Sequence, residues 1–200
     1  EAVKDDENNL LILACAGSGK TKTITTKIAY TIETGRLRPY EICAVTFTNR
    51  AAKEMRDRVA SLLPDIDTTS IVLRTFHSLG ATLLRRFGVT IGLSSDFTIY
   101  DDDDSLQLLL SSAGEVGGEE STQRKKYLRE IMKCISKAKD LGMGPNDSNL
   151  SSITEDPNFR TLFRSYEEAL SRTGNVDFAD LIKKAKELLE IDNNAREYCH

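Results

Sequence analysis

A glycine-rich run near the amino end carries the residues with the clearest chemistry. It reads Ala14-Cys15-Ala16-Gly17-Ser18-Gly19-Lys20-Thr21. In such a loop, successive backbone N–H groups and a helix N-terminus can face an anion, and glycines allow close approach of the backbone. Lys20 would reach the β- and γ-phosphates of a nucleoside triphosphate, and the Thr21 hydroxyl would bind Mg²⁺. We therefore predict that residues 14–21 bind the phosphates of a nucleoside triphosphate.

The segments on either side of this loop have the patterns that it requires. Residues 10–15 form a continuous apolar run, which predicts a buried parallel strand. After the loop, Ile24, Ile28 and Ile32 recur every fourth residue, and Gly35 follows where a helix would end. The strict pattern G-x-x-x-x-G-K-[ST] is broken at position 14, but the predicted strand and helix disfavour an ordinary glycine-rich turn.

Two further strand–helix pairs follow. Residues 42–47 predict a strand, and Asn49 can cap the helix after it. The apolar stripe of that helix comprises Ala52, Met55, Val59 and Leu62. Residues 70–74 predict a third strand and residues 76–86 a third helix. Three such units predict an α/β fold with a doubly wound parallel sheet.

Beyond Gly92 the pattern becomes helical around a glycine- and glutamate-rich loop at residues 114–123. Three apolar stripes predict three helices. They are Tyr127, Ile131, Ile135 and Ala138; Phe159, Leu162, Phe163, Tyr166 and Leu170; and Leu181, Ile182, Ala185, Leu188 and Leu189. We therefore expect a second subdomain that is helical.

A triphosphate site also needs a carboxylate at the end of a neighbouring strand, to hold Mg²⁺ and orient the attacking water. Residues 101–104 are four aspartates after a short apolar segment, but Thr98 interrupts that segment. The alternative is that one of them caps the next helix and the others favour its positive end. The catalytic carboxylate would then lie outside this sequence. Asp177 is placed to cap the last helix and Asp180 lies in its first turn, so we assign neither to catalysis.

Three segments resemble motifs of the UvrD/Rep (PcrA-like) group of superfamily 1 DNA helicases. Residues 44–59, AVTFTNRAAKEMRDRV, resemble motif Ia, and residues 74–80, RTFHSLG, resemble motif Ib. Residues 174–182, GNVDFADLI, resemble the Asp-Phe-x-Asp-Leu motif. The phosphate loop also has the form typical of this family, which usually has alanine at position 14. Cys15 and Lys22 are mild departures, since relatives often have glycine and arginine there.

The resemblance implies a P-loop NTPase (RecA-like) doubly wound parallel sheet with an inserted all-helical subdomain. Residues 1–90 would be the first part of motor domain 1A, residues 91–174 helical subdomain 1B, and residues 175–200 a return toward domain 1A, truncated before motif II. The glutamine that recognises adenine would precede Glu1, and the motif II acids would follow His200. We therefore expect a piece of a longer protein that is inactive on its own.

The resemblance also implies an ATP-dependent DNA helicase, a 3′–5′ single-stranded DNA translocase acting in DNA repair or replication. Its cofactors would be ATP and Mg²⁺, its partners single-stranded DNA and DNA junctions, and its catalytic residues here Lys20 and Thr21. In this family motifs Ia and Ib line the path of the single-stranded DNA. The resemblance therefore implies that the residues at these motif positions bind DNA, namely Phe47, Thr48, Asn49, Thr75 and His77. The alternatives are that Phe47 is core, that Asn49 only caps a helix and that His77 is a structural hydrogen-bonding residue.

Composition and charge exclude some classes of protein function. The net charge of −4 argues against a wholly basic nucleic-acid domain, and the four cysteines include no C-x-x-C pair of a zinc site. No apolar run approaches the roughly 18 residues of a membrane span, so we expect a cytoplasmic protein. The alternatives are a helicase–nuclease of the same superfamily, a P-loop kinase or regulatory NTPase using residues 101–104, and a nucleotide-dependent binding module without turnover.

Overall fold

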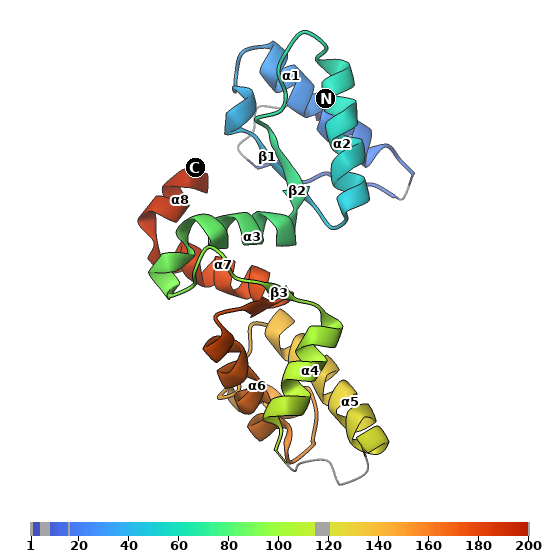
Figure 1. Ribbon diagram of the computed structural model, residues 1–200. Coiled ribbons are helices and arrows are strands. Elements are labelled where there is room, and N and C mark those ends of the chain that lie inside the picture. The colour runs from blue at the N-terminus through green and yellow to red at the C-terminus, as the bar shows by residue number, and fades with distance from the viewer. Residues whose placement is uncertain (1, 5–8, 16, 115–120, 200) are drawn as a thin grey trace. The chain divides into compact units, whose positions relative to one another are not determined.

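A computed structural model describes residues 2–4, 9–15, 17–114 and 121–199, and it divides the chain into two compact units (Figure 1). The first unit spans Glu1–Leu79 and the second Gly80–His200. Helix α3 (Phe76–Phe87) contributes its first residues to the first unit and the others to the second. The glycine- and glutamate-rich loop predicted at 114–123 lies mostly outside the described residues. No helix in the described part of the chain is long and apolar enough to span a membrane.

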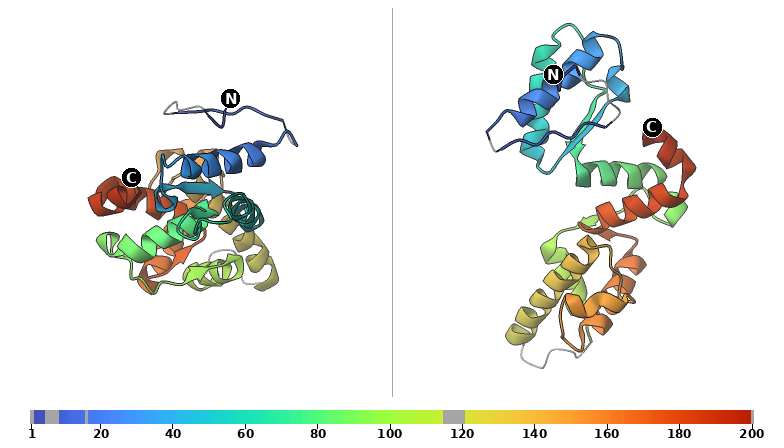
Figure 2. Two further views of the ribbon diagram at one scale, coloured as in Figure 1. Left: turned by 90° about the horizontal axis from the view of Figure 1, so that it is seen from above. Right: turned by 180° about the vertical axis from the view of Figure 1, so that it is seen from behind.

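The first unit is a parallel β-α-β arrangement with one further helix. Its elements are α1 (Lys20–Glu33), the 3₁₀ helix η1 (Pro39–Glu41), β1 (Cys43–Thr46), α2 (Asn49–Leu62) and β2 (Val72–Thr75). The two strands lie side by side in Figure 1 and Figure 2, and their parallel register pairs Cys43 with Val72 and Thr46 with Thr75. The prediction of these strands and helices from residue periodicity is therefore confirmed.

The core of the first unit forms where α1, α2 and β2 meet. Its buried residues are Ile28, Ala29, Ile32, Met55, Val59, Leu63, Ile71 and Leu73. The predicted end of α1 is also confirmed, because Gly35 has a φ of 69°, a conformation that favours glycine.

Three details of the predicted first unit are wrong. Residues 10–15 form neither helix nor strand, and Leu11 and Leu13 are 81% and 86% exposed. A strand exists only through hydrogen bonds to a neighbour, and in the described residues of this unit the sheet contains β1 and β2 alone. Thr48 rather than Asn49 caps α2, because its hydroxyl accepts the Ala51 N–H at 3.1 Å. The predicted core residue Leu62 is exposed, and the next residue along the chain takes its place.

The second unit is mainly helical. Its elements after α3 are η2 (Gly88–Ile91), β3 (Ile99–Tyr100), α4 (Asp102–Ser112), α5 (Ser121–Asp140), η3 (Ser148–Ser152), α6 (Phe159–Thr173), β4 (Val176–Asp177), α7 (Asp180–Ile191) and α8 (Asn193–Cys199). Helices α4, α5 and α6 enclose one apolar core. The apolar stripes predicted for α5 and α6 contribute to it, which confirms both helices, whereas Ile182 of the third stripe is 41% exposed.

The four consecutive aspartates begin α4. The Asp101 carboxylate accepts the N–H groups of Asp103 and Asp104 at 2.9 Å each, and the Asp104 carboxylate accepts the N–H of Asp101 at 3.3 Å. This reciprocal capping confirms the second alternative for the aspartate run. The preceding strand β3 pairs in parallel with β4 and belongs to a different sheet from β1 and β2.

Helices α3 and α7 approach each other closely at Gly80. A Cβ atom added there would lie 2.3 Å from the backbone oxygen of Leu181. Real side chains never approach a backbone oxygen so closely, so the absence of a side chain at this position sets the spacing of the two helices.

Candidate phosphate loop and nucleic-acid edge

The N-terminus of α1 is free to face an anion. Helix α1 begins at Lys20, directly after Gly19, and in the described residues no side chain caps it and no acidic residue occupies its first turn. Gly17 and Gly19 have φ values of 77° and 91°, and a Cβ added to either would meet nothing within 4 Å. The helix dipole and unpaired N–H groups therefore give this end a positive potential toward an open space.

Lys20 is held against its own loop. Its Nζ donates to the carbonyl oxygens of Ala14 at 2.9 Å and Cys15 at 2.7 Å. The hydroxyl of Ser18 donates to the same Cys15 oxygen at 2.6 Å, and the Ser18 N–H does so at 3.2 Å. These contacts close the loop on itself and keep the ammonium group beside the helix N-terminus. Thr21 is half-buried in the first turn of α1, and Ala16 lies outside the described residues.

Two aromatic rings meet at the carboxyl ends of β1 and β2. Because Thr46 pairs with Thr75, the residues that follow, Phe47 and Phe76, emerge side by side. Their ring centroids are 5.6 Å apart and the rings are tilted by 49°. Phe47 is 88% exposed and Phe76 is 44% exposed, so the alternative that Phe47 is a core residue is wrong. The pair presents aromatic faces to solvent, where a flat ring could stack.

Two helices begin at the same edge. Thr48 caps α2 as described above, and the Thr75 hydroxyl accepts the N–H of Ser78 at 3.1 Å at the start of α3. The predicted site residues Asn49 and His77 lie in the first turns of these helices, Asn49 exposed and His77 half-buried. Thr75 is only 7% exposed, so it positions the start of α3. Both helices direct the positive ends of their dipoles toward this edge, which favours an anion such as a phosphate.

The whole chain, residues 1–200, matches the family described as the UvrD/REP helicase N-terminal domain. The chain belongs to this family. It is 37% identical over 206 residues to a probable DNA helicase II homolog of Mycoplasma capricolum, a match covering 98% of the chain and 28% of that relative. It is 37% identical over 188 residues to DNA helicase II of Escherichia coli, covering 94% of the chain and 26% of the relative. It is 36% identical over 209 residues to the ATP-dependent DNA helicase PcrA of Staphylococcus aureus, a match covering 100% of the chain and 28% of that relative.

Membership of the UvrD/REP family gives the chain a P-loop NTPase fold of mixed helices and parallel strands. The chain spans little more than a quarter of the length of these relatives. The residues around α1 fit the phosphates of a nucleotide, because an uncapped helix N-terminus, two glycines with open space beside them and an ammonium group converge there. Thr21 supplies a hydroxyl suited to Mg²⁺.

Phe76 is a residue of the candidate nucleic-acid edge that the sequence analysis did not name. It falls inside the segment that resembles motif Ib, where the prediction named its neighbours Thr75 and His77. A signal was present, because Phe76 follows its strand as Phe47 follows the previous one. Aromatic residues directly after two parallel strands meet at one edge of the sheet.

Proposed function

We propose that this chain is the nucleotide-binding and DNA-binding part of an ATP-dependent DNA helicase that moves 3′ to 5′ along single-stranded DNA. The observation that carries the proposal is the exposed pair of Phe47 and Phe76 between the N-termini of α2 and α3. Aromatic rings stack on bases of any sequence, and helix N-termini attract phosphates, so this edge suits a single strand. The names of the relatives, DNA helicase II and ATP-dependent DNA helicase PcrA, support the same function.

The binding roles divide between the loop and the sheet edge. Backbone N–H groups of residues 14–21 and the ammonium of Lys20 bind the phosphates of ATP, and Thr21 contributes its hydroxyl to Mg²⁺. ATP hydrolysis supplies the free energy for movement when the nucleotide is bound. Phe47 and Phe76 stack on bases, which contributes about 1 to 3 kcal/mol per base. Asn49 and His77 contact the DNA backbone, while Thr48 and Thr75 hold the two helix starts in place.

The proposed architecture extends the two-stranded sheet of the first unit into a doubly wound RecA-like sheet. Residues 10–15 gain strand partners there, which is supported by the exposure of Leu11 and Leu13. Residues 1–90 then belong to motor domain 1A, residues 91–174 to helical subdomain 1B and residues 175–200 to the return toward domain 1A. We place the protein in the cytoplasm, with DNA junctions among its substrates. A P-loop kinase is disfavoured, because the aspartates it would use as metal ligands cap α4.

The test is ATP hydrolysis by the complete protein, with and without a single-stranded oligonucleotide, at fixed low salt because phosphate contacts are salt-sensitive. DNA should strongly stimulate turnover, and unwinding should require a 3′ single-stranded tail. Lys20→Ala should abolish turnover, whereas Lys126→Ala, at an exposed lysine of α5 outside the motif segments, should leave it unchanged. If DNA does not change the turnover rate, the proposed DNA-binding role of the sheet edge is wrong. Full activity of Lys20→Ala would refute the assignment of residues 14–21 as the phosphate-binding loop.

A further inference from the structure

A buried charge network joins four elements of the second unit, α5, α6, β4 and α7. The Lys139 side chain of α5 is fully buried, and its Nζ lies 2.6 Å from Asp177 Oδ2, 2.8 Å from Asp180 Oδ1 and 2.8 Å from Glu167 Oε1. The Tyr166 hydroxyl donates to Asp177 Oδ2 at 2.9 Å. Asp177 Oδ1 accepts the N–H of Asp180 at 2.9 Å, so its side chain pairs the first N–H of α7 as predicted, although Ala179 occupies the N-cap position.

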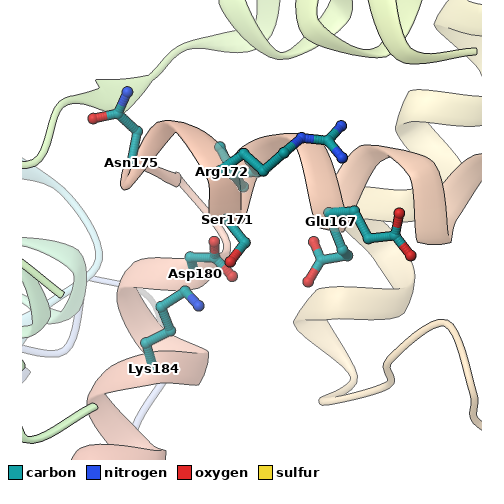
Figure 3. A pocket seen from close by; sticks show the side chains of 8 residues that line it. Glu167, Ser171, Arg172, Asn175, Asp180 and Lys184 are labelled. Atoms are coloured by element: carbon teal, nitrogen blue, oxygen red, sulfur yellow. The ribbon is translucent and has the colours of Figure 1, made fainter. Parts of the chain in front are cut away.

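One oxygen of this network has no hydrogen-bond partner among the residues that the structure describes. Asp180 is 1% exposed, and within the described part of the chain its Oδ2 accepts no hydrogen bond. A buried polar atom left unpaired costs about 1 to 3 kcal/mol, and more when it is charged. Asp180 also lines a cleft of about 540 Å³ formed by residues of α6, of α7 and of the segment between them. Figure 3 shows its carboxylate among the side chains of that lining, near Ser171 and Lys184.

The charges of the network and the cleft do not balance. The network and the lining together contain four carboxylates, on Glu167, Glu168, Asp177 and Asp180. They contain three cationic side chains, on Lys139, Arg172 and Lys184. One negative charge is therefore uncompensated, and the same region holds the one buried carboxylate oxygen for which the described residues provide no donor.

We propose that this cleft binds one organic cation, a primary ammonium or a guanidinium group, whose N–H donates to Asp180 Oδ2. The other oxygen of the same carboxylate already accepts an ammonium group, that of Lys139. A divalent metal ion is disfavoured relative to a singly charged cation, because Arg172 and Lys184 repel a double charge about twice as strongly. Two sources supply such a cation, a small amine or a lysine or arginine side chain of another protein, and the experiment below separates them. This site goes beyond the proposed helicase function and is independent of ATP and DNA.

Lys184 is the internal competitor for this site. It lies one helical turn after Asp180 on α7 and lines the same cleft, so its ammonium repels an incoming cation and can itself approach Asp180. Removal of Lys184 should therefore strengthen cation binding. Removal of an acid at the cleft should weaken it, and Glu168 is suitable because it is exposed and makes no contact with Lys139.

The experiment is calorimetric titration of the complete protein with n-butylammonium chloride, and with tetramethylammonium chloride at equal ionic strength. Butylammonium should bind saturably, whereas tetramethylammonium, which has no N–H donor, should not. A blocked lysine, N-acetyl-lysine methylamide, separates the two sources of the cation. Tighter binding than butylammonium supports a protein side chain as the occupant, and weaker binding supports a small amine. Absence of saturable binding by either, or equal binding of tetramethylammonium, would overturn the proposal.

Three variants that spare the buried network complete the test. Glu168→Gln should lower the affinity for butylammonium severalfold, and Lys184→Gln should raise it severalfold. Glu187→Gln is the matched control, because it is an exposed acid of α7 outside the cleft lining and should leave the affinity unchanged. Circular dichroism confirms that each variant is folded. If Glu168→Gln and Lys184→Gln both bind butylammonium as the control does, the proposed site is wrong.

Discussion

Replacing Lys139 by methionine should destabilise the second unit severely. Methionine keeps the length and apolar stem of the side chain but removes the ammonium group that three carboxylates contact at 2.6 to 2.8 Å. Removing one partner of a buried ion pair costs about 3 to 5 kcal/mol, because the remaining charge is left unpaired. Since a domain of this size is stable by about 5 to 15 kcal/mol, this is a large fraction of the total. The melting temperature should fall on the order of 10 to 20 °C.

The loss caused by Lys139→Met should also depend on pH. Burial opposes the charge of Lys139, but Asp180, Asp177 and Glu167 outweigh it and raise the pKa of the ammonium, which stays charged at neutral pH. Burial raises the pKa of Asp180, and Lys139 counteracts that rise. In the variant, the Asp180 pKa is therefore raised further. A carboxyl group with a folded-state pKa above its unfolded one binds a proton on folding, so stability increases as pH falls toward about 4.

The assay is urea and thermal denaturation of the wild-type chain and the variant at pH 7 and pH 5, followed by circular dichroism. Lys137→Met is the matched control, since Lys137 is an exposed lysine in the same last turn of α5 and has the same relation to the helix dipole. The free energy of unfolding should fall much more for Lys139→Met, and the difference should shrink at pH 5. Similar losses for the two variants, or a larger difference at pH 5, would refute the reasoning.

Three further predictions concern individual contacts. Gly80→Ala should destabilise the chain by about 1 to 3 kcal/mol in denaturation, despite the better helix propensity of alanine, because its Cβ would meet the Leu181 oxygen. Asp101→Ala should reduce the free energy of unfolding by about 0.5 to 2 kcal/mol through loss of the α4 cap. Phe76→Ala in the complete protein should weaken single-stranded DNA binding by about 1 to 3 kcal/mol, measured by fluorescence anisotropy.

Each of these has a control in the chain. Gly144→Ala adds a Cβ that meets nothing within 4 Å, so a loss equal to that of Gly80→Ala would contradict the close contact. Asp65→Ala removes an exposed acid outside the helices. If it lowers the free energy of unfolding as much as Asp101→Ala does, the Asp101 effect is due to charge and not to the α4 cap. Val89→Ala truncates an exposed apolar residue of the second unit, and DNA affinity should be unaffected. Unchanged affinity in Phe76→Ala would remove Phe76 from the proposed track.

Helices were predicted well because their burial pattern is local. The stripes through Ile131 and Ile135 on α5 and through Phe163 and Tyr166 on α6 are buried as expected. A strand is different, because its hydrogen bonds require a neighbour that the local pattern does not identify. Residues 10–15 have the apolar character of a buried strand, yet they are unpaired in the described structure. Apolar character therefore indicated that residues 10–15 can form a strand, but whether they do depends on a neighbouring strand to pair with.

The buried network escaped prediction because its members are far apart in the sequence. Lys139 lies 28 residues before Glu167 and 38 residues before Asp177, and an isolated lysine near a helix end is usually exposed. Spacing correctly predicted that the Asp177 side chain pairs an N–H group at the start of α7. It contained no information that the second oxygen of that carboxylate also binds an ammonium group and a tyrosine hydroxyl. The Asp177 side chain therefore makes both a local hydrogen bond at the start of α7 and a long-range ion pair with Lys139.

The candidate DNA edge depends on the strand register, and the core determines that register. In β2, Leu73 and Thr75 are buried while Arg74 is exposed, so alternate residues face the core formed with α1 and α2. A slip of one residue would turn Leu73 away from that core and would separate Phe76 from Phe47. Burial of Leu73 therefore stabilises the pairing that places the two rings 5.6 Å apart. The motif residues are recognisable in the sequence, but their grouping into one surface results from the packing of β2 against the core of the first unit.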